Sequence, residues 1–86
     1  MRLIPPDGPR RIAKLRRDAQ QIVNDIEWWN ANRTEEQPFD CGAEKVIVDL
    51  CNRGIEAARR KDGDEYSRIT EELVAQAQRE VQAFDD

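Results

Sequence analysis

The amino-acid sequence predicts an all-α fold, an up-down-up three-helix bundle with helices at about residues 9–33, 41–61 and 65–84. Apolar residues recur every three or four positions over most of the chain, which is the spacing of one helix face. Turn-forming residues interrupt this spacing at two places, and short loops make consecutive helices antiparallel neighbours. We therefore expect a leader at 1–8 and a single domain at 9–86. In an alternative arrangement the first helix projects and pairs with a second copy of the chain, so that the domain is oligomeric.

The first helix is predicted from a regular apolar stripe. Pro9 suits the first helical position, where a backbone N–H has no partner within the helix. The stripe then extends over more than four turns at alternating spacings of three and four residues: Ile12, Leu15, Ala19, Ile22, Ile26 and Trp29. It ends before Pro38, which predicts a loop between the first two helices.

The second helix has a wider apolar arc, which predicts that it lies at the centre of the bundle and contacts both other helices. Asp40 is its expected N-cap, and Gly54 indicates that a neighbouring helix approaches closely. Gly63 is the expected C-cap, with Asp64 as the N-cap of the third helix. The apolar stripe of the third helix consists of Tyr66, Ile69, Leu73, Ala77 and Phe84.

Composition limits the classes of function. The chain has 86 residues, of which 37% are charged, with a net charge of −4 and no histidine. Cys41 and Cys51 lie on one predicted helix, separated by about 15 Å along its axis, which is too far for a disulfide. Together with the lack of a long apolar segment, these features favour a soluble, cytoplasmic protein that has no contact with membranes.

The sequence contains no pattern that predicts catalysis or metal binding. Histidine, the usual acid–base group and metal ligand, is absent, and the spacing of the two cysteines does not match a zinc site. Acidic pairs such as Glu71 and Glu72 are adjacent, so they do not converge on one site. We expect a protein that is not an enzyme, with no catalytic residue, no metal and no cofactor.

The adjacent tryptophans, Trp28 and Trp29, predict where another molecule binds. Neighbours on a helix point about 100° apart, so only one ring can enter the core. Trp29 lies at the edge of the apolar stripe, whereas Trp28 continues a polar stripe, and exposed tryptophans are enriched in protein interfaces. The predicted interface consists of Trp28, Asn24, Gln21, Arg17 and Phe39. In the alternative interpretation, the loop of Pro38 and Phe39 covers Trp28 within the same chain.

These features favour a small non-catalytic protein-interaction module, an adaptor or an inhibitor of a larger protein. Its expected partner is another protein, in a hetero-complex or a homodimer, and a compact acidic domain of this kind is compatible with an origin in a phage or another mobile element. A second hypothesis is a nucleic-acid accessory protein, which the overall acidity disfavours, using the basic start of the first helix: Arg10, Arg11, Lys14, Arg16 and Arg17. A third hypothesis is a homo-oligomeric protein with a structural role.

Overall fold

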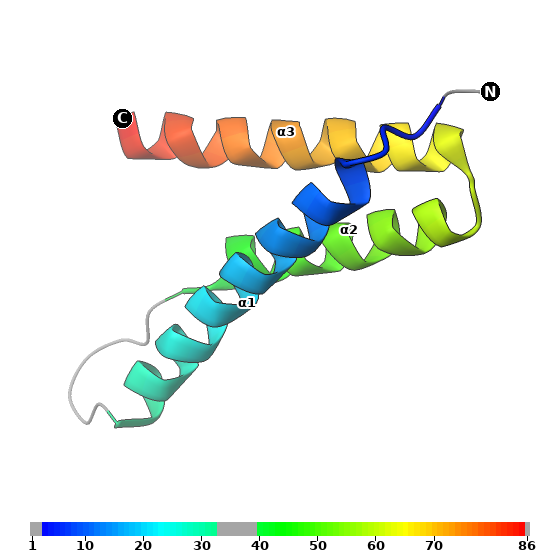
Figure 1. Cartoon of the computed structure of the whole chain (residues 1–86). Helices are drawn as coiled ribbons and strands as arrows, with labels where there is room; N and C mark the ends of the chain where they lie inside the picture. The colour runs from blue at the N-terminus through cyan, green and yellow to red at the C-terminus, as the bar shows by residue number, and fades with distance from the viewer. Residues whose placement is uncertain (1–2, 33–39, 86) are drawn as a thin grey trace.

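The computed structural model describes the backbone of residues 3–32 and 40–85 and the side chains of residues 3–32 and 40–79. Within these residues the chain forms three helices and no strand (Figure 1): α1 at Gly8–Asn32, α2 at Gly42–Arg59 and α3 at Gly63–Asp85. Each helix end lies within two residues of its predicted position. The prediction of an all-α, three-helix bundle is confirmed.

The central helix is α2, as predicted. Both α1 and α3 pack against it, whereas no Cα atom of α1 lies within 8 Å of a Cα atom of α3 in the described part of the chain. Figure 1 shows α2 and α3 side by side and antiparallel, while α1 crosses α2 obliquely and its C-terminal end points away from α3. The bundle therefore has a closed end, at the start of α1, and an open end, at the end of α1.

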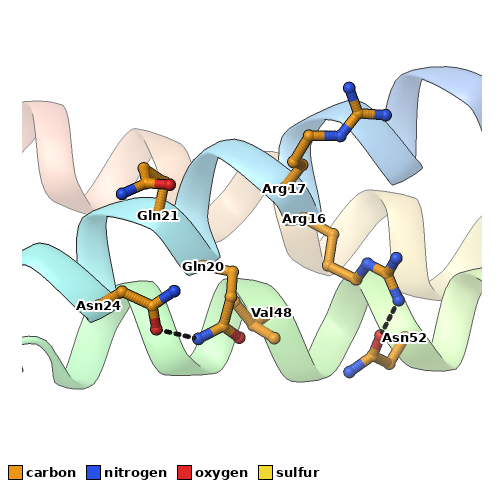
Figure 2. A pocket seen from close by; sticks show the side chains of 7 residues that line it. All are labelled: Arg16, Arg17, Gln20, Gln21, Asn24, Val48 and Asn52. Carbon is orange, nitrogen blue, oxygen red and sulfur yellow. Dashed lines mark hydrogen bonds between the residues drawn. The ribbon is translucent and has the colours of Figure 1, made fainter.

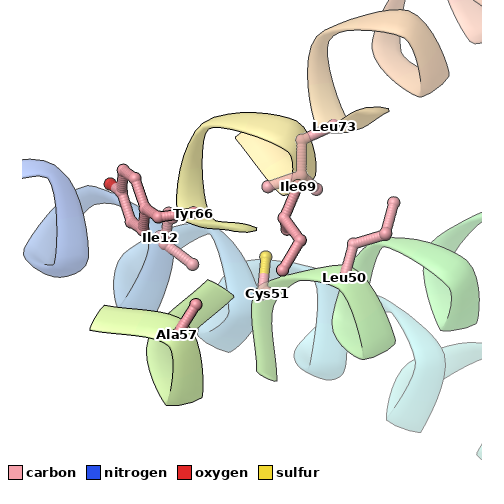
Figure 3. Close-up of a cluster of buried hydrophobic side chains, with 7 residues drawn as sticks. All are labelled: Ile12, Leu50, Cys51, Ala57, Tyr66, Ile69 and Leu73. Atoms are coloured by element: carbon pink, nitrogen blue, oxygen red, sulfur yellow. The ribbon is translucent and has the colours of Figure 1, made fainter. Parts of the chain in front are cut away.

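The core lies where the three helices come together, as Figure 3 shows, and its buried residues come from all of them: Ile12, Leu50, Cys51, Ala57, Tyr66, Ile69 and Leu73. At Gly54 an added Cβ atom would lie 3.3 Å from Cδ1 of Ile12 and 3.4 Å from Cγ2 of Ile69. Both outer helices therefore approach α2 at this glycine, which confirms the predicted close approach. Glycine is less favourable than alanine inside a helix by about 1 kcal/mol, so the limited space rather than helix propensity explains it.

The start of α2 differs from the prediction. Cys41, not Asp40, is the N-cap residue, and it makes no side-chain capping hydrogen bond. Asp40 lies one position earlier, where its Oδ1 accepts a hydrogen bond from the Gly42 amide at 2.9 Å. An aspartate side chain readily bonds to the amide two residues later, so Asp40 satisfies one of the free amides of α2 from outside the helix.

The end of α2 also corrects a prediction. Lys61, rather than Gly63, adopts the left-handed conformation, with φ at 58°. The Lys61 amide donates to the Ala58 carbonyl at 3.0 Å, and the Asp62 amide donates to the Ala57 carbonyl at 2.9 Å. These two bonds form the Schellman pattern that ends many helices, so a lysine occupies the position where glycine is most common.

The start of α3 lies at Gly63, so the predicted N-cap, Asp64, is already inside the helix. Asp62 caps it instead, because its Oδ1 accepts a hydrogen bond from the Glu65 amide at 3.1 Å. Two aspartates flank Gly63, and the sequence alone does not distinguish which of them occupies the cap position.

Candidate protein interface

One line of residues on α1 extends from the closed end of the bundle to the open end. Gly8, Leu15, Ile22 and Trp29 follow one another at intervals close to two helical turns, so they lie along one side of α1. Gly8 is buried against the hydroxyl group of Tyr66 in α3. The exposed fraction then rises to 41% at Leu15, 46% at Ile22 and 56% at Trp29, as α1 diverges from α3.

The prediction that Leu15 and Ile22 belong to the buried stripe is therefore wrong. The apolar side of α1 is wide enough for two neighbouring helices, but only α2 covers it beyond the first turns. The residues of α1 that face α2 are buried: Ile12, Ala19 and Val23. The half of the stripe that a closed bundle would bury against α3 is left exposed.

Both tryptophans are exposed, Trp28 by 59% and Trp29 by 56%. Their ring centroids lie 5.2 Å apart with an interplanar angle of 87°, which is an edge-to-face contact. Neither ring enters the core, and Trp29 is more exposed than its place at the edge of the apolar stripe predicts, because the end of α1 extends past the helices that would cover it. The predicted covering residues, Pro38 and Phe39, lie outside the described residues.

Three of the predicted interface residues, Arg17, Gln21 and Asn24, line one shallow pocket of about 380 Å³ between α1 and α2. Figure 2 shows its polar character: Gln20 Nε2 donates to Asn24 Oδ1 at 3.0 Å, and Arg16 donates to Asn52 Oδ1 at 3.1 Å. The structure thus brings these three residues together, while Trp28 lies outside the pocket lining. Guanidinium and amide groups in this arrangement offer hydrogen bonds to a polar partner surface.

Exposed apolar residues also occur on the other two helices, at Val46 of α2 and Val74 of α3. Val74 helps to line a groove of about 490 Å³ between the leader, the start of α1 and α3, together with Leu3 and Leu73. The sequence places both valines on apolar faces but carries no signal that these positions are uncovered.

The basic residues at the start of α1 are all exposed. Arg11 forms an ion pair with Asp7 at 2.8 Å, and Arg16 is hydrogen-bonded to Asn52. Arg10, Lys14 and Arg17 form no ion pair within the described residues. The start of α1 therefore presents three unneutralised cations.

Both cysteines are buried free thiols. Burial raises the pKa of the Cys51 thiol to about 11, although the nearby Arg16 guanidinium acts in the opposite direction. Cys51 is a packing residue rather than a nucleophile, because a thiol with a raised pKa is protonated at neutral pH. The described residues also contain no cluster of three His, Cys, Asp or Glu side chains that could hold a metal ion.

None of the three helices, over their described residues, is long and apolar enough to cross a membrane. No family model, curated protein or solved structure matches the chain. The functional interpretation therefore depends on the surface of α1: an exposed apolar line that ends at two tryptophans, beside a polar pocket that contains two arginines.

Proposed function

We propose that this chain is a small, non-catalytic protein-interaction module that binds another protein through the exposed side of α1. The observation that supports it most is the exposure of both tryptophans at the open end of the bundle. Tryptophan is the residue type most enriched among those that dominate binding energy in protein interfaces. A partner that covers both rings would remove a large apolar area from water.

Leu15 and Ile22 extend the apolar surface from the tryptophans toward the closed end. Single exposed apolar residues are common on soluble proteins, whereas several along one side of a helix favour an interaction site. Arg17, Gln21 and Asn24 would form the polar rim beside it. An adaptor or an inhibitor of a larger protein needs such a surface and no catalytic group.

The test is the substitution Trp28→Ala, with the exposed apolar substitution Leu3→Ala as a matched control. We expect the Trp28 variant to lose at least about tenfold in affinity for a partner that co-purifies with the intact chain, while its melting temperature changes little. Leu3 lies in the leader and is 92% exposed, so its variant should bind normally. Unchanged binding by the Trp28 variant would contradict the proposal, and a large loss of stability would show that the ring contributes to folding instead.

A second candidate function is an accessory role on nucleic acid. The exposed cations Arg10, Lys14 and Arg17 follow one another at helical spacing and form no ion pair within the described residues, which favours it. The test is binding of double-stranded DNA and RNA oligonucleotides at about 50 and 200 mM salt. Phosphate contacts predict a steep loss of affinity with salt and a weaker slope for the triple variant R10Q/K14Q/R17Q. The absence of binding at low salt would exclude this function.

A further inference from the structure

The exposed apolar line of α1 alternates with two carboxylates. Asp18 lies three residues after Leu15, and Asp25 lies three residues after Ile22. Residues at spacings of three and four are neighbours on a helix surface, so five exposed side chains form one continuous ridge. We call this the α1 ridge: Leu15, Asp18, Ile22, Asp25 and Trp29.

Neither carboxylate of the α1 ridge forms an ion pair within the described residues, although Lys14 lies one helical turn before Asp18. Asp18 has no hydrogen bond or ion pair within them, and Asp25 accepts a hydrogen bond only from the uncharged amide of Gln21, at 2.9 Å. Arg11, which precedes the ridge by one turn, is held by Asp7 at 2.8 Å. The ridge therefore presents two carboxylates between its apolar residues.

The geometry around the α1 ridge suits a helix. The ridge is about 21 Å long, the length of four turns of a partner helix. One turn before the ridge, Arg11 lines the groove that Gly8 of α1 shares with Leu73 and Val74 of α3. A helix laid along the ridge would cover Leu15 and Ile22 and would occupy the side of α1 that α3 leaves open.

Charge argues against a second copy of this chain as the occupant of the α1 ridge. In a parallel pairing of two ridges, Asp18 would face the same aspartate of the second copy. In an antiparallel pairing centred on Ile22, Asp18 would lie beside Asp25 of the second copy. Like charges oppose either arrangement, and the chain as a whole carries a net charge of −4.

We propose that the α1 ridge binds a basic amphipathic helix of another protein, with apolar residues at every third or fourth position and lysine or arginine beside them. This inference depends on the proposed function, since it names the kind of partner that the same surface accepts. Apolar side chains of the partner cover Leu15, Ile22 and Trp29, and its cations pair with Asp18 and Asp25. The carboxylates select the partner by charge, and the apolar residues supply most of the affinity.

The test uses three synthetic peptides of about 18 residues, long enough to span the ridge as a helix. One has a leucine stripe flanked by lysine, the second has glutamate in place of lysine, and the third has the leucines of the first in shuffled order. The fluorescence of the two tryptophans of the chain, both in α1, reports binding. We expect the lysine peptide to bind at least about tenfold more tightly than either other peptide.

Variants separate the contributions of charge and apolar contact. The double substitution D18N/D25N should reduce the preference for lysine over glutamate to about twofold, whereas Ile22→Ser should weaken binding of the lysine peptide about tenfold. Asp49→Asn is the matched control, because it removes an exposed carboxylate of α2, which lies 3.9 Å from Arg53, outside the ridge. It should leave the preference unchanged.

Two results would overturn the inference. Equal binding of the lysine and glutamate peptides, or a preference that survives D18N/D25N, would show that the carboxylates do not select the partner. A dimer in sedimentation that Ile22→Ser dissociates would show that a second copy occupies the ridge. Neither result removes the proposed function, which fails separately if Trp28→Ala leaves capture of the natural partner unchanged.

Discussion

The closed and open ends of the bundle carry the same apolar spacing along α1 but bury it to different extents. At the closed end, Ile12 packs with Ile69 around Gly54, and Ile69 is only 1% exposed. At the open end, Ile22 belongs to the same apolar stripe and is 46% exposed. Apolar periodicity therefore identifies the side of a helix that avoids water, but the crossing angle of the helices decides which part of that side is covered.

The difference between the ends separates stability from binding. Residues at the closed end hold the three helices together, so their substitution should unfold the chain. Residues at the open end contribute less to folding and remain available to a partner. A protein this small buries a modest fraction of its surface on folding. A partner that covers the exposed apolar residues of α1 would therefore raise the free energy of unfolding of the chain.

The largest expected effect is the contrast between Ile69→Ala and Ile22→Ala. The first substitution removes a fully buried side chain and should lower the free energy of unfolding by about 3 kcal/mol, whereas the second should cost less than about 1 kcal/mol. Urea unfolding followed by circular dichroism measures both values under the same conditions. Equal losses in the two variants would show that the two ends do not differ in packing.

The positions of the helices were predictable from the sequence because periodicity and turn residues act locally. The central place of α2 was also predictable, because a wide apolar arc needs two neighbours. The exposure of Leu15 and Ile22 was not predictable, since the sequence contains no local signal for the angle between α1 and α3. For the candidate site, the exposure of Trp28 was expected from the polar stripe, whereas that of Trp29 depends on how far α1 extends past its neighbours.

The turn residues show a second limit of prediction. Lysine disfavours the left-handed conformation, so the nearby Gly63 was the more natural candidate for the helix end. In the structure Lys61 adopts the left-handed conformation at the end of α2, and Asp62, the next residue, then caps α3. Competition between adjacent capping residues is decided by the whole turn rather than by the preference of one residue.

The two buried thiols report how readily the core and the start of α2 open. Cys51 lies in the core and is 0% exposed, whereas Cys41 occupies the N-cap position of α2. Helix ends open locally while core residues require global unfolding, so a thiol reagent should modify Cys41 about a hundredfold faster than Cys51 at neutral pH. The single variants Cys41→Ala and Cys51→Ala assign the two rates. Similar rates for both thiols would indicate that the core opens as readily as the helix end.

A smaller effect is expected from Gly8→Ala, which tests the contact between the apolar line and α3 at Tyr66. A Cβ atom at this position would overlap the hydroxyl group of Tyr66, so the substitution should destabilise the chain by about 1–3 kcal/mol. Tyr66→Phe removes that hydroxyl group, and the double variant G8A/Y66F should therefore lose less than the sum of the two single variants. Additive losses in thermal unfolding would show that the two residues do not interact.

The smallest expected effect is a gain of stability at the turn of the closed end. Lys61 occupies the left-handed position of the Schellman motif, with φ at 58°. Glycine adopts this conformation without a steric clash because it lacks a Cβ atom. Lys61→Gly should raise the free energy of unfolding by about 0.5–1 kcal/mol, after allowance for the greater freedom of glycine in the unfolded chain. Arg60→Gly is the matched control, because Arg60 has φ at −79° and ψ at −2°, so glycine there should bring no gain. A decrease for Lys61→Gly in thermal unfolding would mean that the lysine side chain contributes more to the closed end than its backbone conformation costs.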